Sequence, residues 1–171
     1  MGYPAIKVNK EKLKHNTKVL AEKCGRLGIN VVPVTKVYCG IPEIAEASVA
    51  AGVKMLADSR IENIIKLKEL NAEKMLLRIP MLSQVDEIVE YVDISLNSEY
   101  EVIKALSDKA QKRGKVHKII LMADLGDLRE GVWYKDAVEF AGRIVKLPGI
   151  KLVGLGTNLT CYGAVIPSVE N

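Results

Sequence analysis

Short apolar runs rich in Val, Ile and Leu alternate along the chain with longer amphipathic segments, and this alternation constrains the fold more than any other feature. Strands are expected at residues 31–36, 53–58, 74–80, 92–97, 118–124 and 151–158. Because helical segments separate these runs, the pattern predicts βαβ units and a parallel sheet. The fold class is therefore α/β, either an open doubly wound sheet or a (β/α) barrel. No glycine-rich phosphate-binding motif follows the first strand, which disfavours a nucleotide-binding doubly wound sheet.

Helix starts are marked by residues that can cap a helix. Asn9 is expected to cap a first helix that runs to about residue 27. Ser59 with Glu62, and Ser98 with Glu101, have the spacing of a capping box. These pairs predict that two further helices begin directly after the second and fourth strands.

Composition and charge exclude several classes of protein. The chain has 171 residues, 49% hydrophobic and 27% charged, which is ordinary for a globular domain. Residues 1–36 carry eight Lys or Arg and two Glu, but no aromatic residue lies among the lysines of the first helix, at residues 9–27, as a nucleic-acid surface would require. No apolar run is long enough for a membrane span, and three scattered cysteines favour a reducing compartment. We expect a cytoplasmic protein without a nucleic-acid or membrane partner.

Polar side chains occur where the expected strands end, and Lys36 is the most informative of them. It shares the parity of Val32 and Val34, so it is expected to point toward an apolar strand face. Desolvation lowers the pKa of a lysine and makes its amine a nucleophile. The alternative is a lysine that extends past the strand end into water. Pro33 lies inside this strand and cannot donate a ladder hydrogen bond there.

Two loops that follow strands are further candidates for binding. In residues 124–131, Arg129 could clamp an anion with two hydrogen bonds, although an ordinary charged loop is an equal alternative. Residues 156–163 combine glycines, hydroxyls and an amide. Cys161, within this segment, is expected to be a plain loop residue. His117 begins its strand, away from the ligand-binding end, and is expected to be structural. No cluster of His, Cys and carboxylates has metal-ligand spacing, so no metal is expected.

Several segments together resemble the N-terminal half of the alanine-racemase-like, fold-type III enzymes that use pyridoxal 5′-phosphate, the ornithine racemases among them. The segments are TKVYCG (35–40), ADSR (57–60), LLRIP (76–80), ISLNS (94–98), LMADLGDLREG (121–131) and VGLGTNLTCYG (153–163). The resemblance covers nearly the whole chain. It implies a (β/α)8 barrel of the TIM type, of which this chain supplies about six units as one incomplete domain over residues 1–171.

The resemblance also implies roles for individual residues. Lys36 matches the lysine that forms the Schiff base with pyridoxal 5′-phosphate. Tyr38 corresponds to a tyrosine that holds its phosphate, but in alanine racemases that tyrosine directly precedes the glycine, whereas Cys39 intervenes here. Arg129 matches an arginine near the phenolic oxygen of the cofactor and the substrate carboxylate. Asn158 falls where alanine racemases usually have a histidine against the cofactor ring. Met122 replaces a lysine that supports the arginine in many alanine racemases, which counts against a standard alanine racemase.

The implied activity is racemisation of an amino acid, with a basic one such as ornithine as the substrate. Lys36 would exchange the cofactor for the substrate amine and then move the Cα proton on one face. Asp124, Asp127 and Glu130 are candidates to accept the distal ammonium group. In the resembled racemases the second acid/base is a tyrosine of the partner subunit, and no residue here matches it. We therefore expect a homodimer, or association with the remaining half of the barrel.

Two other functions fit the same residues. The first is a non-enzymatic protein that binds pyridoxal 5′-phosphate on the same barrel, as single-domain relatives do. The second is an aldolase-type barrel in which Lys36 forms a Schiff base with a carbonyl substrate. Racemisation of L-ornithine separates the racemase from the first alternative. Borohydride trapping with an aldehyde, without the colour of the cofactor, would favour the second.

Overall fold

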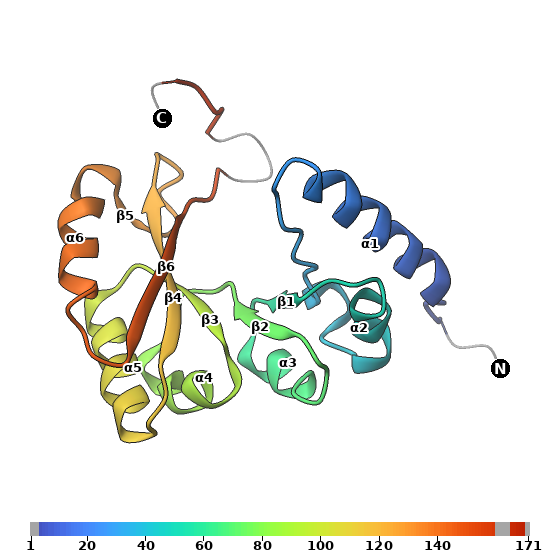
Figure 1. Ribbon diagram of the computed structural model, residues 1–171, viewed down its shortest axis with the longest axis horizontal. Helices are drawn as coiled ribbons and strands as arrows, with labels where there is room; N and C mark the ends of the chain where they lie inside the picture. Colours follow the sequence, from blue (N-terminus) through green and yellow to red (C-terminus); the bar gives the residue numbers. More distant parts are fainter. Residues whose placement is uncertain (1–3, 160–164, 170–171) are drawn as a thin grey trace. The chain divides into compact units, whose positions relative to one another are not determined.

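The computed structural model describes residues 4–159 and 165–169. The chain forms two compact units, Met1–Lys74 and Met75–Asn171, and each unit is described by itself. Figure 1 shows the order of the helices and strands along the chain. Among the described residues, none of the helices is both long and apolar enough to cross a membrane.

The first unit is a helical segment followed by a β/α unit. Its elements are α1 (Lys10–Gly25), η1 (Lys36–Tyr38), α2 (Pro42–Val49), β1 (Met55–Asp58) and α3 (Ile61–Lys66), and β2 (Glu73–Leu76) spans the boundary to the second unit. Asn9 caps α1 as predicted, because its side-chain oxygen accepts a hydrogen bond of 2.9 Å from the Lys12 amide. The core joins Ala45 of α2 to Leu56 of β1 and Leu67 beyond α3.

The strand expected at residues 31–36 is reduced to a single parallel bridge between Val34 and Ala57. The Pro33 carbonyl accepts from the Ala57 amide at 2.9 Å, and the Thr35 amide donates to the Ala57 carbonyl at 2.8 Å. Pro33 has no amide hydrogen, so the ladder does not extend around it. After Thr35 the chain leaves the strand direction and forms the 3₁₀ turn η1, which contains Lys36.

The two predicted capping boxes are also absent. The residue before α3 is Arg60, and the residue before α5 (Tyr100–Lys112) is Glu99, and neither side chain caps its helix. Asp58 replaces Ser59 at the start of α3, because its Oδ1 atom accepts a 2.9 Å hydrogen bond from the Arg60 amide. The helices form as expected, but they begin later than the capping pattern predicts.

The second unit contains a parallel sheet with helices, as predicted. Its other elements are η2 (Leu82–Gln84), α4 (Val85–Tyr91), β3 (Ile94–Asn97), β4 (His117–Asp124), β5 (Val132–Trp133), η3 (Tyr134–Asp136), α6 (Ala137–Ile144) and β6 (Ile150–Gly156). Strand β3 pairs with β2 and β4, and β4 also pairs with β6, all in parallel. The short strand β5 adds a parallel pair at the end of β4, inside a segment predicted to be loop.

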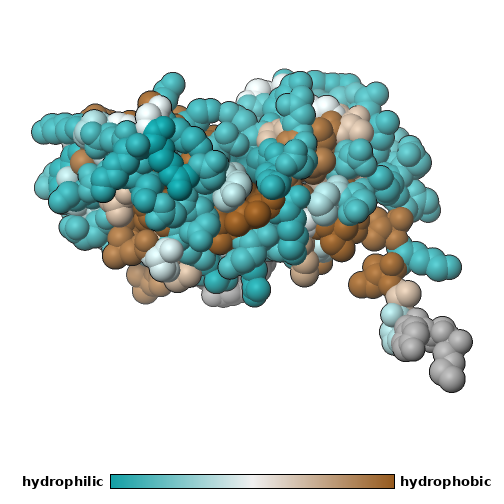
Figure 2. All heavy atoms as spheres, turned by 90° about the horizontal axis from the view of Figure 1, so that it is seen from below, coloured by the Kyte–Doolittle hydropathy of each residue, from teal (hydrophilic) through white to brown (hydrophobic). Residues whose placement is uncertain are grey.

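Alternate residues of β4 face two different environments. Ile119 and Leu121 are fully buried against Ile103 of α5 and Ile144 of α6, which cover this face of the strand (Figure 1). Met122 belongs to the alternate set of residues and lies over Gly156. A Cβ added to Gly156 would lie 2.8 Å from the Met122 sulfur. Apolar side chains also reach the surface in patches between polar ones (Figure 2).

Candidate active site

The loop after β4 folds back on the end of its own strand. Asp124 directs the fold, because its Oδ1 atom accepts hydrogen bonds from the amides of Gly126 (2.8 Å) and Leu128 (3.1 Å). Gly131 has a φ of 120°, and a Cβ there would lie 2.6 Å from the Asp124 amide nitrogen. Leu128 has a φ of 56°, a left-handed conformation that is uncommon for a residue with a side chain. The loop is therefore tightly constrained around Arg129, which follows Leu128.

Arg129 and Asn158 are brought together by Glu130. The guanidinium of Arg129 donates from Nε to Glu130 Oε2 at 3.1 Å and from Nη2 to Oε1 at 2.9 Å. The Asn158 amide donates to the same Oε1 at 3.0 Å. The hydrogen bond from Arg129 is the main cause that lowers the pKa of Glu130, so its carboxylate is charged at neutral pH. Glu130 therefore orients two residues that the sequence places in the site.

Asp127 is buried beside the same arginine. Its side chain is 3% exposed, and its Oδ2 atom lies 3.8 Å from the Nε atom of Arg129. Neither of its carboxylate oxygens accepts a hydrogen bond. A buried carboxylate without hydrogen bonds is costly, so both oxygens of Asp127 retain the capacity to accept a donor, although Asp127 does not line the pocket beside this loop.

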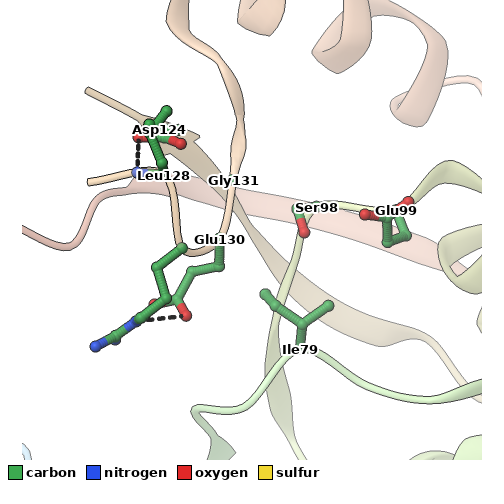
Figure 3. Close-up of a pocket in the computed structure, with 8 residues that line it drawn as sticks. Ile79, Ser98, Glu99, Asp124, Leu128, Glu130 and Gly131 are labelled. Carbon is green, nitrogen blue, oxygen red and sulfur yellow. Dashed lines mark hydrogen bonds and ion pairs between the residues drawn. The ribbon is translucent and has the colours of Figure 1, made fainter. Parts of the chain in front are cut away.

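A pocket of about 410 Å³ opens beside this loop. It is lined by Ile79, Ser98, Glu99, Asp124, Leu128, Arg129, Glu130 and Gly131. Ile79 and Ser98 face Glu130 across the pocket (Figure 3). Ser98 follows β3 and the loop follows β4, so the predicted gathering of polar groups at the carboxyl ends of the strands is confirmed within this unit. Arg78 is exposed and does not line the pocket.

Lys36 and Tyr38 lie in the first unit, on the turn η1. Lys36 is exposed, and Val34 is 38% exposed, so the expectation of a lysine on a buried strand face is wrong. The reason is that the chain turns after Thr35 and Lys36 is no longer in a strand. Tyr38 is half-buried, and burial, followed by the charge of Asp58, raises the pKa of its phenol. The phenol is therefore protonated at neutral pH and able to donate a hydrogen bond.

Asp58 is the residue of this unit whose importance the sequence reasoning missed. In the sequence it is only one residue of the segment at 57–60, yet it is fully buried and accepts three hydrogen bonds. Cys161 lies outside the described residues. No group of three or more His, Cys, Asp or Glu side chains within the described part of the chain could hold a metal ion.

The parallel sheet, its helices and the polar loops at the carboxyl ends of its strands define part of an α/β barrel. The profile of the alanine racemase N-terminal domain matches residues 8–169. The chain belongs to this family.

Individual relatives agree with this assignment. The chain is 45% identical to an ornithine racemase of Acetoanaerobium sticklandii over 99% of its own length and 48% of the relative. It is 40% identical to a lysine racemase of Thermotoga maritima, again over 99% of this chain and 48% of the relative. The structure of an alanine racemase from Streptomyces lavendulae superposes with a TM-score of 0.78 at 20% identity, covering 89% of this chain and 41% of that one. The chain thus spans about half the length of the curated relatives it matches.

The residues present fit pyridoxal 5′-phosphate in their chemistry. Lys36 offers an accessible amine for an aldehyde. Tyr38 offers a protonated phenol, and the Arg129 guanidinium and Asn158 amide offer donors for anionic oxygens.

Proposed function

We propose that this chain is the lysine-bearing part of a pyridoxal 5′-phosphate-dependent racemase that acts on a basic amino acid such as ornithine or lysine. The observation that carries the proposal is the identity of 45% and 40% to an ornithine and a lysine racemase over 99% of the chain. The accessible amine of Lys36 on a constrained turn supports it.

The proposed mechanism divides the work between the cofactor and the protein. When bound, pyridoxal 5′-phosphate supplies an electron sink for the negative charge that develops at Cα. Lys36 would hold the cofactor through its amine, and the same amine, once free, would take or return the Cα proton on one face. Tyr38 would donate a hydrogen bond to the phosphate. Arg129 and Asn158, oriented by Glu130, bind the anionic oxygens of the substrate and cofactor.

Racemisation also needs an acid or base on the opposite face of Cα. We propose that this group comes from a partner subunit of a cytoplasmic homodimer, because two of the carboxylates near Arg129, Asp124 and Glu130, already accept structural hydrogen bonds, and the third, Asp127, is assigned to the substrate side chain below. Asp124 is held by two amides of its own loop, and Glu130 is paired with Arg129.

The hydrogen bonds that these carboxylates accept also indicate which of them would bind the distal ammonium group of a basic substrate. Asp124 already accepts hydrogen bonds from the backbone, and Glu130 already accepts them from Arg129 and Asn158. Asp127 is the remaining candidate, with two oxygens that accept no hydrogen bond. A substrate ammonium would supply the missing donors. We propose that Asp127 favours substrates with a cationic side chain.

Substitution of Asp127 tests this assignment in the full-length protein. Asp127→Asn is expected to lower kcat/KM for L-ornithine by roughly 10-fold to 100-fold, because the charged hydrogen bond is worth about 1.5–3 kcal/mol. The value for the uncharged analogue L-norvaline is expected to change little. Asp108→Asn, which removes the same charge from an exposed position of α5, is the control. An equal loss for both substrates would contradict the specificity role.

The racemase activity is tested by following the optical rotation of L-ornithine with the full-length protein and added pyridoxal 5′-phosphate. Loss of rotation in the wild type, and none in Lys36→Ala, is the expected result. Binding of the cofactor without any racemisation of L-ornithine, L-lysine or L-alanine would overturn the proposal in favour of a non-enzymatic binding protein.

A further inference from the structure

The turn that carries Lys36 is fixed at its beginning by a buried carboxylate. Thr35 is fully buried, and its hydroxyl lies 2.6 Å from Asp58 Oδ2 and 3.3 Å from the Ala57 carbonyl, so it donates toward both. The Thr35 carbonyl in turn accepts from the amides of Tyr38 and Gly40, each at 3.2 Å. The residue before Lys36 is therefore held through its side chain and its backbone.

Asp58 connects this first anchor to helix α3. Its Oδ1 atom accepts hydrogen bonds from the Arg60 amide at 2.9 Å and from the Asn63 side chain at 3.1 Å. Asp58 and Asn63 are 0% and 6% exposed. A buried carboxylate that accepts three hydrogen bonds has little freedom to move.

The end of the turn is fixed by the same helix. The Lys66 ammonium donates to the Cys39 carbonyl at 2.8 Å and to Asn63 Oδ1 at 3.1 Å. Cys39 has a φ of 54°, so its carbonyl points in a direction that ordinary helical or extended backbone does not allow. Gly40 packs so closely that a Cβ there would lie 2.8 Å from the Cβ of Asn63.

Lys36 thus lies between two residues, Thr35 and Cys39, that are held by the same network of hydrogen bonds. Thr35, on one side of Lys36, binds Asp58, and Cys39, on the other side, binds Lys66. Asn63 joins Asp58 to Lys66, which places a negative and a positive group at the two ends of the connection. A left-handed residue such as Cys39 is strained, and a contact that holds it offsets this cost.

We propose that Asp58, Asn63 and Lys66 act as positioning residues that hold the Lys36 amine in the geometry required for its reaction with an aldehyde cofactor. The inference rests on the proposed function. Its basis is that a misplacement of about 1 Å of a reacting group can cost roughly 100-fold in rate. None of the three touches the reacting atoms in this role, and each acts through the backbone of residues 35–40.

Lys66 offers the cleanest test, because it lies on the exposed face of α3 and its removal leaves the core unchanged. Lys66→Met keeps the aliphatic chain and loses both hydrogen bonds. Lys66→Arg keeps donors that can reach the same acceptors. Lys68→Met is the matched control, since the Lys68 ammonium lies 3.9 Å from Glu69 at the surface and contacts no residue of the turn.

The experiment mixes the full-length protein with pyridoxal 5′-phosphate and follows the visible absorption of the lysine-bound cofactor. Borohydride reduction and peptide mass analysis then identify the modified lysine. Lys66→Met is expected to slow modification of Lys36 roughly 10-fold to 100-fold and to shift its pH profile, with kcat reduced more than KM is raised. Lys66→Arg is expected to restore most of the rate, and Lys68→Met to match the wild type.

The outcomes separate this inference from the proposed function. If the wild type is modified at Lys36, and Lys66→Met reacts at the same rate with the same pH profile, the positioning role is overturned while the proposed function stands. If the wild type is not modified at Lys36 at all, both are overturned. Circular dichroism checks that each variant is folded. Should Lys66→Met not fold, Lys66→Gln, whose shorter side chain cannot reach both acceptors, takes its place under the same criteria.

Discussion

His117 shows how a single buried residue makes the stability of this protein depend on pH. It lies at the start of β4, 3% exposed, with its Nε2 atom 2.8 Å from the Ser95 hydroxyl. Burial lowers its pKa from 6.5 to about 4. The expectation that His117 is structural agrees with this environment, since it lies at the opposite end of β4 from the Asp124 loop.

We predict that acidification from pH 6.5 to about 4 destabilises the protein through this residue. In that range the unfolded histidine takes up a proton and the buried one does not, so the free energy of unfolding falls as the pH falls. At about 1.4 kcal/mol for each unit of pKa, the loss is roughly 3 kcal/mol. Urea unfolding at several pH values measures it. His117→Asn is expected to remove this part of the dependence of the free energy of unfolding on pH. His15→Asn, which changes an exposed residue of α1, is expected to keep it. An equal dependence on pH in the wild type and both variants would contradict the prediction.

A second prediction at the scale of single residues concerns the loop around Arg129. Gly131→Ala would place a Cβ 2.6 Å from the Asp124 amide nitrogen at a φ of 120°, so the loop must move. We expect a loss of about 1–3 kcal/mol in stability, together with a loss of racemase activity because Arg129 and Glu130 shift.

Gly142→Ala is the matched control for this change. Gly142 lies within α6 and has no atom within 4 Å of an added Cβ. The substitution is expected to leave activity unchanged and to stabilise the helix by up to about 1 kcal/mol. Thermal unfolding and the racemisation assay measure both variants. Equal effects of the two substitutions would show that the close contact at Gly131 is unimportant.

The residues of the site could be predicted only in part. Lys36, Arg129 and Asn158 are predicted from the segments that contain them, and Arg129 and Asn158 donate hydrogen bonds to the same carboxylate, that of Glu130. The role of Glu130 was not predictable, because it depends on a contact with Asn158, 28 positions away. The exposure of Lys36 agrees with the alternative of a lysine that extends past the strand end into water, because Lys36 lies beyond the residues that pair as a strand.

At the scale of helices and strands, the start of α1 and the start of α3 provide a direct comparison of two capping predictions. Asn9→Ala is expected to cost about 1 kcal/mol, because it removes the hydrogen bond to the Lys12 amide. Ser59→Ala is expected to have little effect, because Asp58 already binds the Arg60 amide. Urea unfolding of both variants measures the difference. A larger loss for Ser59→Ala than for Asn9→Ala would contradict the structure of these two helix starts.

Periodicity predicted most elements and failed where a local feature had a stronger effect. Strands β3, β4 and β6 lie within about two residues of their predicted positions, because buried parallel strands are continuous apolar runs. The strand at residues 31–36 was not formed, because Pro33 lacks the amide hydrogen that the ladder needs. β5 was missed, because two residues carry no periodicity and pair only where the loop brings them beside β4.

At the scale of the whole molecule, the arrangement of parallel β/α units was predictable from the alternation of apolar runs and helical segments. The described part of β6 pairs only with β4, and Leu155 on it is 64% exposed. The relatives are about twice as long as this chain. The racemase activity is therefore proposed for the full-length protein, and its tests use that protein.

The central claim is that Lys36 carries pyridoxal 5′-phosphate, and the visible absorption spectrum of the full-length protein tests it most directly. With the cofactor added, the wild type is predicted to show the band of the lysine-bound cofactor. Lys36→Ala is predicted to lack that band, while the control Lys68→Met shows it. A spectrum of Lys36→Ala identical to that of the wild type, or no such band in the wild type, would contradict the account.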